Sequence, residues 1–140
     1  MHKLLISTVA ALAALALASA AAARVAATPR LPPGWSHAEI NVIVRGVPHT
    51  LVYDRGRVQA VSATSLTLRE RDGSSQVINV SPSSQVTIDG QPASLSQVRR
   101  FEIAITLRID GADATRVTVR VPPGVAAAIA RQQARLGQHS

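Results

Sequence analysis

The chain has 140 residues, the size of one domain, and a formal net charge of +7. It contains no cysteine, and its phenylalanine, tyrosine and tryptophan residues are Phe101, Tyr53 and Trp35. This composition excludes a disulfide scaffold, a cysteine-ligated metal site and a cysteine nucleophile.

The first 23 residues have the organisation of a secretory signal peptide. A basic start that ends at Lys3 precedes an apolar run to Ala18, and small residues then offer two cleavage sites. Signal peptidase recognises this order of charge, apolar stretch and small residues. We therefore expect cleavage of residues 1–23 and export of the mature chain to the periplasm, the cell wall or the medium, with no transmembrane segment left. An uncleaved membrane anchor is the alternative.

The mature chain is basic. Lys3 is the one lysine, so 14 arginines then face eight acidic residues, a net charge of +6. Such a surplus favours anionic partners such as wall polymers, lipid headgroups or nucleic acid. Most arginines are scattered, which also fits a solvated surface without a partner. The arginines that lie close together are Arg99-Arg100 and the pairs Arg55/Arg57 and Arg69/Arg71.

The mature chain divides into three parts. Residues 24–37 are rich in proline and alanine and show no apolar period, which predicts a linker. Residues 38–121 alternate between apolar and polar side chains, the pattern of β-strands. Residues 122–140 begin with Pro122-Pro123-Gly124 and continue with an alanine-rich run, which predicts a helical or disordered tail.

Turn residues divide the alternating region into about eight short strands. The expected strands lie near residues 40–44, 50–53, 57–61, 65–70, 76–80, 85–89, 101–109 and 115–121, and a helical turn is expected at 92–98. The expected reversals are Gly46-Val47-Pro48, Arg55-Gly56, Asp72-Gly73, Asp89-Gly90 and Asp110-Gly111. This spacing predicts a mainly β fold, a small antiparallel barrel or sandwich, with a short C-terminal helix. We expect Phe101 to lie in the core.

One stretch of the chain resembles a known family. A glycine-led strand at residues 56–61 is followed by Ser65-Leu66-Thr67-Leu68, by Asp72-Gly73, and by Asp89-Gly90-Gln91-Pro92-Ala93-Ser94-Leu95 before a long apolar strand. From about Gly56 to Arg120 this order resembles the secreted bacterial domain of unknown function 5666. The resemblance implies a small exported β-barrel-like module and supplies no catalytic residues.

Two sets of residues are candidate sites. Arg55, Arg57, Arg99 and Arg100 are candidate contacts for an anionic envelope polymer, because the mature chain has a net charge of +6. His37, Glu39 and His49 are the alternative, a weak metal-dependent or hydrolytic site, because His37 and Glu39 share one strand face and His49 follows the first expected turn. Hydrogen-bonded or solvated side chains are the competing interpretation of this trio.

No motif of a nucleophilic, dinucleotide-binding or phosphate-binding enzyme occurs in the chain. We therefore expect a non-enzymatic structural or binding module without a cofactor. Its partner would be an anionic polymer or another envelope protein, which could pair with an open strand edge at Ile40–Arg45. A nucleic-acid binder of the OB type is a further alternative, which the scarcity of aromatic residues disfavours.

Overall fold

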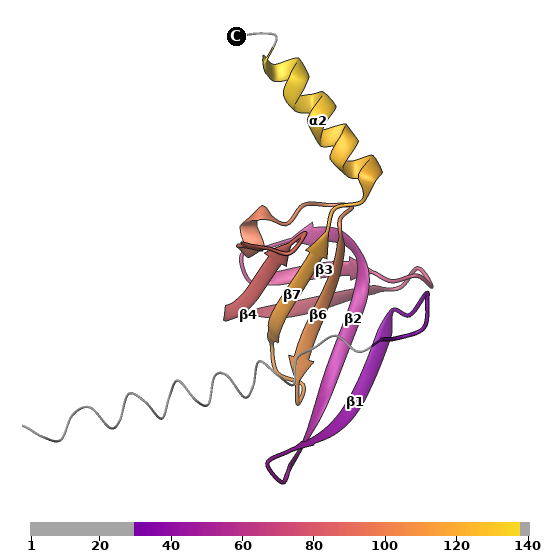
Figure 1. The fold of residues 1–140 in the computed structure, drawn as a ribbon, viewed down its shortest axis with the longest axis vertical. Helices are drawn as coiled ribbons and strands as arrows, with labels where there is room; N and C mark the ends of the chain where they lie inside the picture. Colours follow the sequence, from indigo (N-terminus) through magenta and orange to yellow (C-terminus); the bar gives the residue numbers. More distant parts are fainter. Residues whose placement is uncertain (1–29, 138–140) are drawn as a thin grey trace, which may run out of the picture. The chain divides into compact units, whose positions relative to one another are not determined.

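The computed structural model describes residues 30–137, which form a β-barrel followed by one helix (Figure 1). The predicted signal peptide, residues 24–29 of the predicted linker and the last three residues of the tail lie outside the described residues. The elements in chain order are β1 (His37–Val44), β2 (Val47–Val61), β3 (Ser65–Arg69), β4 (Ser75–Ile88), β5 (Gln91–Ala93), the 3₁₀ turn η1 (Leu95–Gln97), β6 (Ile103–Ile109), β7 (Ala114–Arg120) and α2 (Pro123–Gly137).

The strands form one sheet that closes on itself. Its order is β1-β2-β3-β4-β7-β6, and β6 also pairs with β2, so five strands make a closed ring. Strands β2, β3 and β4 follow one another, and β6 returns to lie beside β2, which is a Greek-key arrangement. A five-stranded Greek-key barrel is the architecture of OB-type folds. The prediction of a small barrel is confirmed, with one parallel pair, β4 and β7, among antiparallel ones.

Two strands are longer than predicted. The expected strands at 50–53 and 57–61 are one strand, β2, and those at 76–80 and 85–89 are one strand, β4. In β2 the pairing shifts between Val58 and Ala60, and in β4 it shifts between Val80 and Gln85. Such irregularities bend a strand around the corner of a barrel without reversing it. The prediction of a turn at Arg55-Gly56 was therefore wrong.

Other turn predictions agree with the backbone. Asp89-Gly90 and Asp110-Gly111 have positive φ at both residues, as two-residue hairpin turns of the primed type require. The first hairpin has the same geometry, at Arg45-Gly46. Gly46-Val47-Pro48 was the wrong position for it, because β2 already begins at Val47.

The barrel interior is apolar and closely filled. Its buried residues are Val58, Leu66, Leu68, Ile78, Val80, Val86, Val98, Ala104, Ala114, Val117 and Val119. Phe101 is not among them: it has a φ of 74° and is 53% exposed, so the prediction of a core position was wrong. The neighbouring Glu102 is buried in its place, and its carboxylate accepts the Arg99 backbone N–H at 2.9 Å. This hydrogen bond lies within the turn before β6, in which Phe101 is exposed.

Two elements extend the ring. Strand β1 pairs with β2 alone among the described strands, so its other edge is open, which agrees with the edge expected there. Helix α2 begins with Pro123, a residue whose fixed φ suits the first helical turn, and none of its residues is buried. No helix in residues 30–137 has the length and hydropathy needed to cross a lipid bilayer.

Candidate anion-binding site

Four arginines gather on the outside of the barrel where β2 and β3 run side by side. Arg55 and Arg57 are two residues apart on β2 and therefore point to the same face. Arg57 is directly opposite Arg69 of β3, and Arg71 follows the end of that strand. The sequence pairs Arg55/Arg57 and Arg69/Arg71 thus become one cluster, because the hairpin between β2 and β3 places them next to each other.

The cluster surrounds a cavity of about 330 Å³. Its lining consists of Trp35, Arg55, Gly56, Arg57, Arg69, Glu70, Arg71 and Ile103. A hollow of this size, with an apolar wall and a few convergent polar groups, is typical of small-ligand sites. Four positive charges and one carboxylate leave a local excess that favours an anion.

The segment before β1 forms one wall of the cavity. The backbone N–H of Arg55 donates to the Ser36 carbonyl at 2.6 Å, which fixes this segment against β2. The Trp35 ring then lies 5.9 Å from the Arg55 guanidinium carbon, within the range of a cation–π contact. Gly34 has a φ of +89°, and a Cβ there would lie 2.5 Å from Nη1 of Arg71. The positive φ favours glycine at this position, whereas the flexible Arg71 side chain could move away from a Cβ there.

Within residues 30–137, no ion pair neutralises the charges of the cavity. None of Arg55, Arg57, Arg69 and Arg71 forms an ion pair there, in contrast to Arg108, which pairs with Asp54. An arginine guanidinium remains protonated at any ordinary pH. The cavity therefore presents four fixed positive charges with unused N–H donors.

The other two arginines proposed from the sequence lie elsewhere. Arg99 and Arg100 precede β6 and do not line this cavity. The Arg100 guanidinium carbon is 5.1 Å from the centre of the Phe101 ring. Of the residues chosen from the sequence, Arg55 and Arg57 line the cavity, whereas its lining residues Trp35, Arg69, Glu70 and Arg71 were not chosen. Two arginines separated by one residue occur on both sides of the β2–β3 hairpin. This shared spacing is the sequence signal that could have pointed to Arg69.

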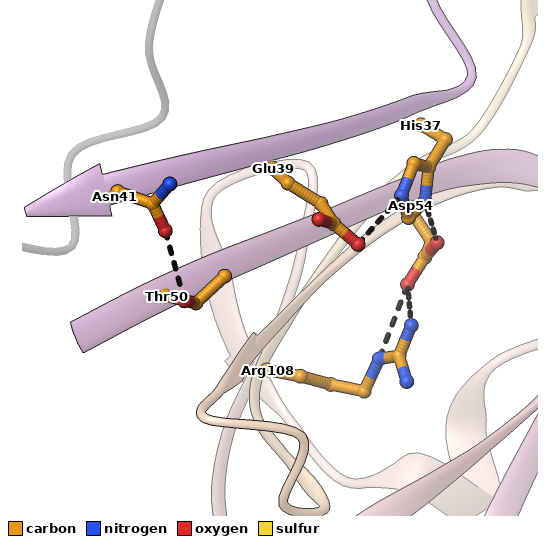
Figure 2. A network of polar contacts seen from close by, with 6 residues as sticks. All are labelled: His37, Glu39, Asn41, Thr50, Asp54 and Arg108. Carbon is orange, nitrogen blue, oxygen red and sulfur yellow. Dashed lines mark hydrogen bonds and ion pairs between the residues drawn. The ribbon is translucent and has the colours of Figure 1, made fainter.

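A second polar cluster lies where β1, β2 and β6 meet (Figure 2). The Asp54 side chain is 1% exposed, and its two oxygens have different partners. One accepts from Nε and Nη2 of Arg108 at 3.2 and 2.8 Å, and the other is 2.7 Å from Nδ1 of His37. Nε2 of His37 is 3.4 Å from a carboxylate oxygen of Glu39. The buried carboxylate therefore ties three strands together.

This cluster has the chemistry of a structural ion network. Both ring nitrogens of His37 face carboxylates, an arrangement that suits the doubly protonated, charged imidazole. A histidine that serves as a general base needs one unprotonated nitrogen directed at a nucleophile. The geometry of His37 favours charge pairing over that role.

The metal-dependent alternative lacks a converged set of ligands. His37 is opposite Asp54 in the β1–β2 register, whereas His49 is opposite Val42. His49 instead contacts Asp110, with Nδ1 2.7 Å from Oδ2. Among the described residues, no group of three or more histidine, aspartate or glutamate side chains is placed to hold a metal ion.

Searches of family models, curated proteins and solved structures found no match to this chain.

The His37 network predicts a pH dependence of stability. The hydrogen bond to Asp54 is the main cause that raises the pKa of His37 above 6.5, and burial opposes it. A raised pKa in the folded state means that the stabilisation is complete below about pH 6.5 and is lost as the pH rises through the folded-state pKa. We expect the melting temperature of the wild type to fall relative to that of His37→Gln between about pH 6.5 and 8.

Thermal melts of both proteins at a series of pH values test this expectation. Glu39→Gln is the matched control, and it should keep most of the pH dependence because Asp54 is the stronger partner of His37. Parallel curves for the wild type and His37→Gln across this pH range would contradict it.

Proposed function

We propose that this protein is an exported, non-enzymatic binding module that holds an anionic polymer of the cell envelope in the arginine-lined cavity. The observation that carries the proposal is the convergence on a single hollow of one tryptophan and four arginines that have no carboxylate partner within residues 30–137. The signal-peptide pattern of residues 1–23 supports the exported location. Membership of the secreted domain of unknown function 5666 family, suggested by residues 56–120, is part of the same proposal.

Retention on an anionic polysaccharide resin tests this function. The purified protein should be retained at low ionic strength and released by salt, because surface electrostatic attraction is screened by ions. Arg55→Gln/Arg57→Gln should elute at a clearly lower salt concentration than the wild type, because both side chains line the cavity.

Two further double variants remove the same charge from other places. Arg131→Gln/Arg135→Gln alters only the exposed helix α2 and should elute close to the wild type. Arg99→Gln/Arg100→Gln should also elute close to it, because neither residue lines the cavity. Equal losses in all three double variants would mean that net charge alone causes retention, and the proposal would be wrong.

A single-stranded nucleic-acid binder is the second candidate function. The Greek-key barrel favours it, since OB-type barrels bind oligonucleotides through basic grooves and stacking aromatic rings. The cavity offers one such ring, Trp35, whereas Tyr53 is buried at 2% exposure. A competition experiment on the polysaccharide resin distinguishes the two candidates. If oligodeoxythymidylate released the protein at a far lower concentration of negative charges than soluble polysaccharide does, nucleic acid would be the better ligand.

A further inference from the structure

Two arginines of the cavity face each other in an arrangement that is unfavourable by itself. Arg57 and Arg69 are direct partners in the antiparallel β2–β3 register. Side chains at such positions have Cβ atoms about 4.5–5.5 Å apart, and like charges there destabilise a sheet. Within the described residues neither arginine has a carboxylate partner. Unfavourable local choices of this kind are expected where a protein binds a ligand.

We infer that the Arg57–Arg69 pair is the subsite for a phosphoryl group on a sugar unit of the envelope polymer. This inference rests on the proposed function and specifies its ligand. A carboxylate has two oxygens, and a single arginine guanidinium can donate hydrogen bonds to both of them. A phosphoryl group instead offers three acceptor oxygens. A phosphoryl group can therefore accept from both arginines at once and neutralise the two facing charges.

The rest of the cavity accommodates the organic part of such a ligand. Trp35 and Ile103 provide apolar surface beside the arginines, and about 330 Å³ exceeds what a phosphoryl group alone requires. Proteins usually bind a membrane surface with a projecting basic patch or an amphipathic helix. A hollow with an aromatic wall instead favours a phosphate that is attached to a ring.

The single tryptophan of the chain makes the cavity directly observable. Trp35 lines the hollow, so its fluorescence reports on binding there. We expect glucose 6-phosphate to change this fluorescence with higher affinity than glucuronate, the matched sugar carboxylate, or inorganic phosphate. Arg57→Gln and Arg69→Gln should each weaken binding of glucose 6-phosphate about tenfold or more, because each removes a charge-assisted hydrogen bond. Arg131→Gln/Arg135→Gln should leave the affinity unchanged.

A stability measurement without ligand gives an independent test. Because the two charges repel each other, Arg69→Gln should melt at or above the wild-type temperature at low ionic strength, and the difference should shrink as salt is added. An arginine with a purely structural role would lower the melting temperature when replaced. This measurement also shows that the variant is folded.

The outcomes separate this inference from the proposed function. Equal affinity for glucose 6-phosphate and glucuronate, or unchanged affinity in Arg69→Gln, would overturn the phosphoryl subsite. Capture by phosphatidylglycerol vesicles without binding of glucose 6-phosphate would overturn it in favour of a lipid headgroup. In each case, preferential loss of resin retention by Arg55→Gln/Arg57→Gln would still support the anion-binding function.

Discussion

Replacing Arg108 with leucine is expected to lower the free energy of unfolding by about 3–5 kcal/mol, because it leaves a buried carboxylate without its guanidinium partner. The Asp54 side chain is 1% exposed, and both of its contacts with Arg108 are made by the same oxygen. His37 contacts only the other oxygen. Urea denaturation followed by circular dichroism at pH 7 measures the loss.

Two variants control for effects other than the lost ion pair. Arg120→Leu makes the same substitution at an exposed position of β7 and should change stability by less than about 0.5 kcal/mol. The double variant Asp54→Asn/Arg108→Leu should recover part of the loss, because no unpaired buried charge remains. If Arg108→Leu were as harmless as Arg120→Leu, the Asp54 network would not hold the three strands together.

Replacing Gly56 with alanine is expected to cost about 1–3 kcal/mol by overpacking two neighbouring strands. A Cβ at this position would lie 2.7 Å from the Arg69 carbonyl oxygen and 3.0 Å from Cβ of Leu68. The nearest atom belongs to the backbone, so a side-chain rotation cannot relieve the clash. Strands β2 and β3 would have to separate at the position where Arg57 faces Arg69.

Gly124→Ala is the matched control for Gly56→Ala. Gly124 lies near the start of α2, and nothing lies within 4 Å of a Cβ there. This substitution should be neutral or slightly stabilising, since alanine has the higher helix propensity. Urea denaturation of both variants measures the effect of the close approach of β2 to β3. Equal stabilities of Gly56→Ala and Gly124→Ala would contradict the expected clash at Gly56.

Local patterns were sufficient to predict the class of fold and several of its turns. Alternating side chains predicted strands, and Asp89-Gly90 and Asp110-Gly111 occupy the positive-φ positions expected of them. These features depend on the conformational preferences of adjacent residues. The arginines of the cavity were likewise visible as two closely spaced pairs, although only Arg55 and Arg57 were chosen as contacts.

The glycine at position 56 shows where local patterns fail. Arg55-Gly56 resembles a turn in sequence, yet the residues lie inside a 15-residue strand. The glycine is needed because another strand approaches its Cα, a requirement set by residues more than ten positions away. Trp35 was assigned to the linker for a similar reason, because its contact with Arg55 depends on how the segment crosses the barrel.

The sequence by itself determined most strand positions, several hairpin turns, the basic charge and the expectation of export, because each depends on composition or on near neighbours. Only the tertiary structure decided which faces and edges meet. In β6, Ala104 and Thr106 are completely buried, whereas Ile103 and Ile105 on the other face are half-buried and Leu107 is the buried residue of that face. Alternation alone would favour the isoleucines for the interior. Closure of the ring places the other face of β6 inside, because β6 must pair with both β2 and β7. The same pairing brings Arg108 of β6 next to Asp54 of β2.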